Sequence, residues 1–109
     1  MKDRTVSVVD GWVWDRNVEP LLRLLSRYVG YSFDDTDWQT VVLGLEGTDD
    51  EQDSRWYSYP LVGHQQLDVA LAHAIGSDVV SVRIDGLTDH DMVLRAETLL
   101  DAYAATLPG

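Results

Sequence analysis

The sequence predicts an α+β domain in which an antiparallel sheet packs against about three helices on one face. Its length of 109 residues suits a single domain, spanning residues 1–109, with one hydrophobic core. Apolar residues make up 45% and charged residues 25%, a globular balance that excludes a disordered or fibrous chain. Stretches with helical spacing of apolar residues are separate from stretches in which apolar residues alternate. This order favours an antiparallel sheet with helices on one side.

The first two strands are expected near the N-terminus. Asp10 and Gly11 form a dipeptide that suits a two-residue turn, because glycine tolerates a positive φ. Residues 5–9 and 12–14, on either side of this dipeptide, are rich in valine and tryptophan, which favour strands. The pattern therefore predicts an opening β-hairpin.

The next two segments predict helices. From Asn17, a candidate N-cap, apolar residues recur at helical spacing until Gly30 ends the pattern. A second helix is expected to begin at Thr36, whose hydroxyl would accept from the amide of Gln39 in a capping box. Gly47 is well placed to end this second helix.

Three strands are expected in the second half of the chain. Residues 55–62 alternate aromatic and small side chains, and Pro60 restricts this strand to an edge because proline has no amide proton to donate. Residues 67–73 fit a strand by their alternation and also fit a short helix closed by Gly76. We favour the strand, because residues 78–84 make a natural antiparallel partner.

The last segment predicts a third helix. Thr88 is a candidate cap with Asp91 at the third helical position, and apolar residues follow at helical spacing from Met92 to Leu107. The expected sheet is thus an N-terminal hairpin plus a C-terminal meander of strands.

The strongest functional signal is the excess of acidic residues. Nineteen Asp and Glu residues stand against eight Lys and Arg residues, which gives a net charge of −11. Binding of phosphates needs clustered Lys and Arg, so no nucleic acid partner is expected. Residues 28–54 hold eight of the acids and no Lys or Arg. Three of the eight suit the dipole at a helix start, and the other five suit either a solvated loop or a recognition surface.

A recognition surface for a basic protein is the interpretation we favour. Complementary charge accelerates the association of two proteins, and tryptophan and tyrosine are the usual anchors of an interface. Alternation along residues 55–62 places Trp56 on one face of the strand and Tyr57 on the other. The candidate partner-binding residues are Asp34, Asp35, Asp37, Asp49, Asp50, Glu51, Asp53, Trp56 and Tyr57.

No catalytic or metal-binding motif stands out. The chain has no cysteine, which excludes disulfides, thiolate nucleophiles and cysteine-ligated zinc. His64, His73 and His90 lack the spacing of metal ligands, so no metal or other cofactor is expected. We favour a protein without enzymatic activity. The alternative is a small-molecule-binding or catalytic domain with an aromatic pocket of Trp and Tyr that involves His73.

Two segments resemble known proteins. Residues 55–63, RWYSYPLVG, and residues 76–83, GSDVVSVR, look like segments of small uncharacterised acidic proteins of actinobacterial type. In size, acidity and architecture the chain also resembles the immunity proteins that neutralise bacterial toxins. This second resemblance implies an inhibitor that occludes a basic toxin or nuclease, and it implies no catalytic residues.

The sequence also predicts a cytoplasmic protein that is not bound to a membrane. The N-terminus lacks the apolar stretch of a secretory signal, and no apolar run approaches the length of a membrane span. The absence of cysteine fits a reducing compartment. We expect a monomer or a weak homodimer, the latter formed through the edge strand after Arg55.

Overall fold

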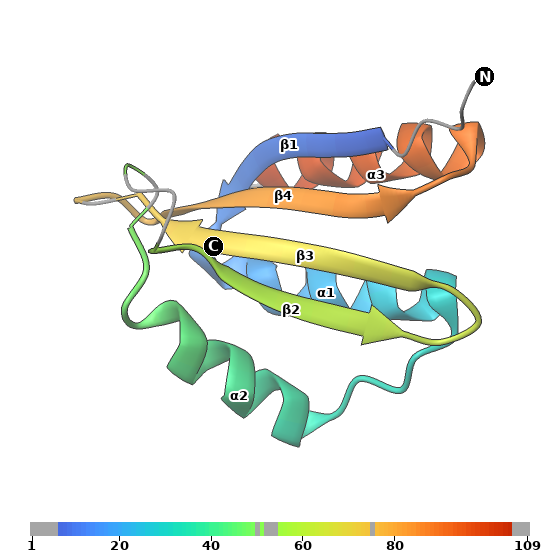
Figure 1. The fold of residues 1–109 in the computed structure, drawn as a ribbon. Coiled ribbons are helices and arrows are strands. Elements are labelled where there is room, and N and C mark those ends of the chain that lie inside the picture. Colours follow the sequence, from blue (N-terminus) through green and yellow to red (C-terminus); the bar gives the residue numbers. More distant parts are fainter. Residues whose placement is uncertain (1–6, 50, 52–54, 75, 106–109) are drawn as a thin grey trace.

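A four-stranded antiparallel sheet and three α-helices make up the fold in the computed structural model, which describes residues 7–49, 51, 55–74 and 76–105 (Figure 1). The predicted α+β class is confirmed. The elements in chain order are β1 (Ser7–Trp14), the short 3-10 helix η1 (Asp15–Asn17), α1 (Val18–Val29), α2 (Asp35–Leu45), β2 (Tyr57–Val62), β3 (Gln66–His73), β4 (Val79–Leu87) and α3 (His90–Ala105).

The predicted N-terminal hairpin is wrong, because β1 is one continuous strand that runs through Asp10 and Gly11. It pairs antiparallel with β4, so the strand order is β1-β4-β3-β2, in which β2, β3 and β4 form the expected meander. Gly11 serves a close approach between elements instead of a turn. A Cβ atom at Gly11 would lie 3.0 Å from Cδ1 of Leu100 in α3.

All three helices cover the same face of the sheet, as predicted. A row of paired residues crosses the strands from Gly11 through Val82 and Leu71 to Tyr57. At one end of this row Gly11 lies against α3, and at the other end the ring of Tyr57 lies against Gly44 of α2. Figure 1 shows α1 and α3 behind the sheet, with α2 beside the β2 edge. The largest fully buried side chains between these layers include Leu21, Leu22, Leu25, Leu61, Leu67, Leu71, Ile84 and Leu87.

The strands of the meander follow the predicted alternation. Residues 67–73, which also fitted a helix, belong to strand β3, where every second side chain from Leu67 to Leu71 is buried. β2 is an edge strand, as Pro60 indicated. Pairing with β4 explains why residues 67–73 form a strand and not a helix, because β4 gives each residue from Asp68 to His73 a strand partner.

The helix caps differ from the predictions. α1 ends at Gly30, which has a φ of 77° as expected, but Asn17 does not cap the helix; its Nδ2 donates to the Tyr103 carbonyl oxygen of α3 at 2.8 Å. α2 begins earlier than predicted, with Asp34 as its N-cap in place of Thr36, and ends at Leu45, before Gly47.

α3 also begins one residue later than its predicted cap implies. The Asp89 carboxylate, and not the Thr88 hydroxyl, accepts from the Asp91 amide at 2.9 Å. A carboxylate accepts hydrogen bonds at a helix start and also interacts favourably with the helix dipole. Among the described residues, no helix has the length and apolar content needed to cross a membrane.

Candidate functional site

The predicted acidic residues separate into two groups at opposite ends of α2. Asp34, Asp35 and Asp37 stand at its start, whereas Asp49 and Glu51 follow its end. Eleven helical residues span roughly 16 Å, so the two groups do not form one continuous patch. Of the other predicted acids, Asp50 and Asp53 lie outside the described residues.

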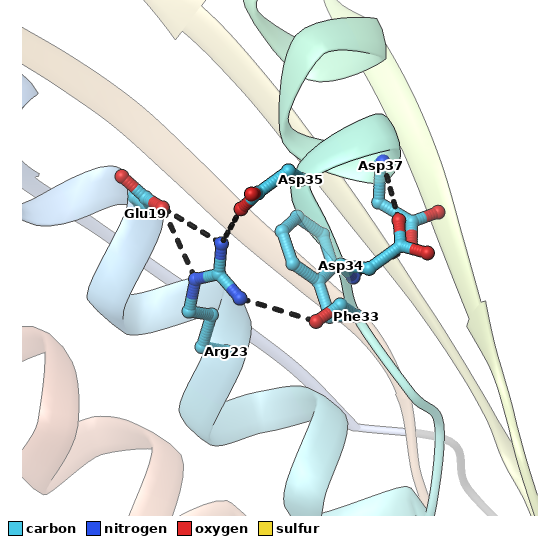
Figure 2. A network of polar contacts seen from close by, with 6 residues as sticks. All are labelled: Glu19, Arg23, Phe33, Asp34, Asp35 and Asp37. Carbon is cyan, nitrogen blue, oxygen red and sulfur yellow. Dashed lines mark hydrogen bonds and ion pairs between the residues drawn. The ribbon is translucent and has the colours of Figure 1, made fainter.

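The first group holds the start of α2 in place. Arg23 of α1 lies between two carboxylates, with its Nη2 2.9 Å from Glu19 Oε2 and 3.0 Å from Asp35 Oδ1 (Figure 2). The same guanidinium donates to the carbonyl oxygen of Phe33 at 3.2 Å and lies over its ring. The Asp34 side chain accepts from the Asp37 amide at 3.0 Å and completes the capping box.

Asp37 is the hub of a second network, which joins α2 to β2. Its Oδ1 accepts from the hydroxyls of Tyr31 and Tyr59, each at 2.5 Å. Burial alone would raise the pKa of Asp37, but the two hydroxyls and the Asp34 amide outweigh it and lower that pKa to about 2. Burial and the Asp37 carboxylate raise the pKa of Tyr59. These contacts give Asp37 a role in the fold.

The two predicted aromatic anchors lie on opposite faces of the sheet, as the alternation indicated. Tyr57 is half-buried beneath Gly44 of α2 and packs against the core. Trp56 stacks on the guanidinium of Arg83, with 4.6 Å between Cζ and the ring centroid. The Trp56 Nε1 is buried and has no hydrogen-bond partner within the described part of the chain. Trp56 therefore belongs to the face away from the helices, and Tyr57 does not.

That face of the sheet carries no helix among the described elements, and we call it the open face. Its side chains alternate along each strand with those of the core. Three large apolar side chains on this face have a high exposed fraction. It is 47% for Val8, 42% for Trp12 and 54% for Val62. The open face consists of Val8, Asp10, Trp12, Trp56, Ser58, Pro60, Val62, Gln66, Asp68, Ala70, Ala72, Ser81, Arg83 and Asp85, among which Ala72 is fully buried.

Carboxylates outnumber cations on the open face. Asp10 forms an ion pair with Arg83 at 3.0 Å. Asp68 and Asp85 are direct cross-strand partners, so two negative charges stand opposite each other. Like charges in this position destabilise a sheet. Three carboxylates and one arginine leave a net charge of −2 on this face. Asp68 and Asp85 each accept one local hydrogen bond, from Gln66 and Gly86, which does not require their negative charge.

Sequence reasoning missed Trp12, Asp68 and Asp85 as site residues. The signal for Asp68 was the alternation of residues 67–73, and the signal for Asp85 was the continuation of the alternation of residues 78–84 by one residue, because β4 extends to Leu87. Trp12 was predicted to belong to a hairpin, so its position opposite Ser81 of β4 on the open face was not predicted.

A separate cleft lies where the alternative hypothesis expected an aromatic pocket. It has a volume of about 350 Å³, with an apolar lining from α2 and a charged rim. His73, at the end of β3, lines it together with Trp38, but no tyrosine does. Its lining residues are Asp15, Arg16, Trp38, Val42, Leu45, Glu46 and His73. Over the described ranges, no group of three or more His, Cys, Asp or Glu side chains is arranged to hold a metal ion.

Comparisons with known proteins do not assign this chain to a family. No family model matches it, and neither a curated protein nor a solved structure matches it. The resemblance to immunity proteins therefore stays a prediction.

Proposed function

We propose that this protein is a non-enzymatic binding module for a basic protein and that the open face is its contact surface. The observation that carries the proposal is a sheet face on which none of the described helices packs and on which exposed tryptophan and valine occur together with an excess of carboxylates. Exposed apolar patches with a polar surround mark interaction sites in proteins.

The aromatic residues supply the anchors of the proposed contact. Trp12 and Trp56 stand near the two edges of the sheet, and the row between them holds only the small residues Ser81 and Ala72. Three strand spacings separate their backbone positions by roughly 14 Å, and the Trp56 ring extends across the sheet to the guanidinium of Arg83 in β4. A protein segment that lies across the strands would contact both tryptophans, which are the residues that most often dominate binding energy.

The charge of the chain supports a basic partner. The net charge of −11 accelerates encounter with a cationic surface, and Asp68 and Asp85 then meet that surface at the contact itself. An inhibitor of the immunity type is the form we favour, with the open face covering the cationic substrate cleft of a toxin or nuclease. Asp35, which lies beside Arg23 of α1 on the helix side of the sheet, contributes long-range attraction only.

The test is to identify a basic partner by capture from native cells and to measure its affinity for the purified wild type and for D68N/D85N. We expect D68N/D85N to bind about tenfold more weakly at about 50 mM salt, because two exposed charge pairs contribute roughly 0.5–1 kcal/mol each. At about 500 mM salt the difference should shrink. The asparagine side chains retain the hydrogen bonds from Gly86 and Gln66, so the fold is preserved.

A matched control removes the same charge elsewhere. D35N/E46Q neutralises two exposed carboxylates at the start and end of α2, a helix that packs on the opposite face of the sheet. We expect it to change the affinity less than twofold. If it weakens binding as much as D68N/D85N does, net charge alone explains the effect and the open face is not the contact surface.

D68N/D85N should also unfold at a slightly higher urea concentration than the wild type, because it removes like-charge repulsion.

A second candidate function is small-molecule binding in the cleft beside His73. The observation that favours it is a cleft of about 350 Å³ with an indole wall, which falls within the size range of ligand pockets. In an NMR screen of small aromatic compounds, we expect ligands to shift the Trp38 indole and His73 imidazole signals together. H73A should weaken such ligands at least tenfold. Ligands that bind H73A and wild type equally would contradict this function.

A further inference from the structure

A second cleft runs along the free edge of β1, and it adjoins the open face. It has a volume of about 350 Å³ and lies between β1 and α3. Asp10 and Trp12 belong both to this cleft and to the open face, so the two surfaces are continuous. The lining residues are Asp10, Gly11, Trp12, Glu97, Leu100, Asp101 and Ala104.

The aromatic wall of this cleft is held in place before any partner arrives. Trp12 meets Trp14 edge to face, with ring centroids 5.5 Å apart and an interplanar angle of 88°. The Nε1 of Trp14 in turn donates to the carbonyl oxygen of Ala104 at 2.8 Å, which fixes the pair to α3. An indole that is 42% exposed is thus kept rigid at the mouth of a cleft. A rigid exposed ring loses little conformational entropy on binding.

The charge of the cleft is entirely negative. Three of the seven lining residues are carboxylates, and none is a cation. Asp10 has Arg83 as its ion-pair partner, whereas Glu97 and Asp101 form no ion pair with any described residue. Glu97 and Asp101 are four residues apart on α3, and like charges at this spacing destabilise a helix. As with Asp68 and Asp85, folding alone does not account for this arrangement.

We infer that this cleft receives an arginine side chain of the basic partner. The inference rests on the proposed function, because it names the group that the open face meets at its β1 edge. A guanidinium is planar and carries five N–H donors, so it stacks on an indole while it donates to carboxylates at its rim. Trp12 supplies the ring, and Glu97 and Asp101 supply the acceptors. Lysine has a compact, strongly hydrated charge that uses this geometry less well.

The experiment titrates the isotope-labelled full chain with three peptides of the same length and follows the Trp12 indole N–H signal, which is assigned with W12F. The peptides are tetra-arginine, tetra-lysine and tetra-citrulline, the last of which keeps the shape of arginine without its charge. We expect tetra-arginine to shift the Trp12 signal and to bind at least threefold more tightly than tetra-lysine. Tetra-citrulline should leave the signal unchanged.

Two variants locate the effect. E97Q/D101N should weaken tetra-arginine binding about tenfold, whereas D35N/E46Q, which removes the same charge at α2 beside the opposite edge of the sheet (Figure 1), should weaken it less than twofold. Equal losses in the two variants, or equal affinity for arginine and lysine, would overturn the arginine site. The proposed function is judged separately, by the effect of D68N/D85N on the captured partner. If that effect is seen while the peptide experiment fails, the open face stands and only the arginine site is wrong.

Discussion

Replacing Gly63 with alanine is expected to destabilise the fold by about 3 kcal/mol. Gly63 opens the turn between β2 and β3, which is docked on the end of α1: the His64 amide donates to the Val29 carbonyl oxygen at 2.7 Å. A Cβ atom at Gly63 would lie 1.8 Å from that same oxygen and 2.6 Å from the Val29 carbonyl carbon. Both neighbours are backbone atoms, so no side-chain rotation relieves the clash. The turn must leave the helix and lose the hydrogen bond.

The measurement is a urea titration of G63A beside the wild type, with G47A as the control. Gly47 follows α2 and has no positive φ, and a Cβ atom added there would meet no other atom within 4 Å. We expect G47A to change the free energy of unfolding by no more than about 0.5 kcal/mol. Equal midpoints for G63A and the wild type would show that the turn does not dock on α1 as described.

The parts of the fold that could be predicted from sequence are those set by local periodicity. β3 and β4 bury every second side chain over much of their length, β2 alternates less exposed with exposed side chains, and α1 keeps one apolar face up to Gly30. Such patterns are specified within one segment, because burial on one side of a strand or helix repeats with a fixed period.

The errors arose where a distant partner competes with a local signal. Asp10 and Gly11 form a good turn dipeptide, yet pairing with Arg83 and Val82 of β4, more than 70 residues later, keeps β1 extended. A local turn joins only its own two flanks, whereas β4 offers partners along most of the strand. The start of α2 was predicted two residues too late because several side chains that can cap a helix stand close together there. Asp34 is the N-cap, since its carboxylate accepts from the Asp37 amide.

The candidate site could be predicted only in part for the same reason. Sequence indicated an acidic protein with aromatic anchors and placed Trp56 and Tyr57 on opposite faces. It did not indicate which face the helices would cover, because that depends on how α1, α2 and α3 pack against the finished sheet. Tyr57 lies beneath α2, so Trp56 is the one predicted aromatic anchor that lies on the open face. Trp12 is a second anchor on this face, and it comes from a segment that was predicted to form a hairpin.

The second large effect is expected at Asp37. Its pKa is about 2 in the folded protein against an ordinary value of 3.8, so the folded state favours the charged carboxylate. A lowered pKa contributes stability that is complete above about pH 4 and is lost as the pH falls toward 2. D37N should therefore unfold about 1–2 kcal/mol more easily than the wild type at neutral pH, because hydrogen bonds to a charged acceptor are weakened. The difference between the two proteins should disappear between about pH 4 and pH 2.

The tyrosine hydroxyls allow the cause of this effect to be checked. Y59F removes one of the two donors to the Asp37 carboxylate and leaves the ring in place, so the pKa of Asp37 should rise toward its ordinary value. Carboxyl chemical shifts, followed by NMR from pH 5 to about pH 2, report this pKa directly. D35N serves as the control, because Asp35 has a side chain that is 97% exposed and takes no part in the tyrosine network. If D35N and D37N shift the acid unfolding profile equally, the shift is caused by general charge at the start of α2. The hydrogen bonds of Asp37 with Tyr31 and Tyr59 would then not be its cause.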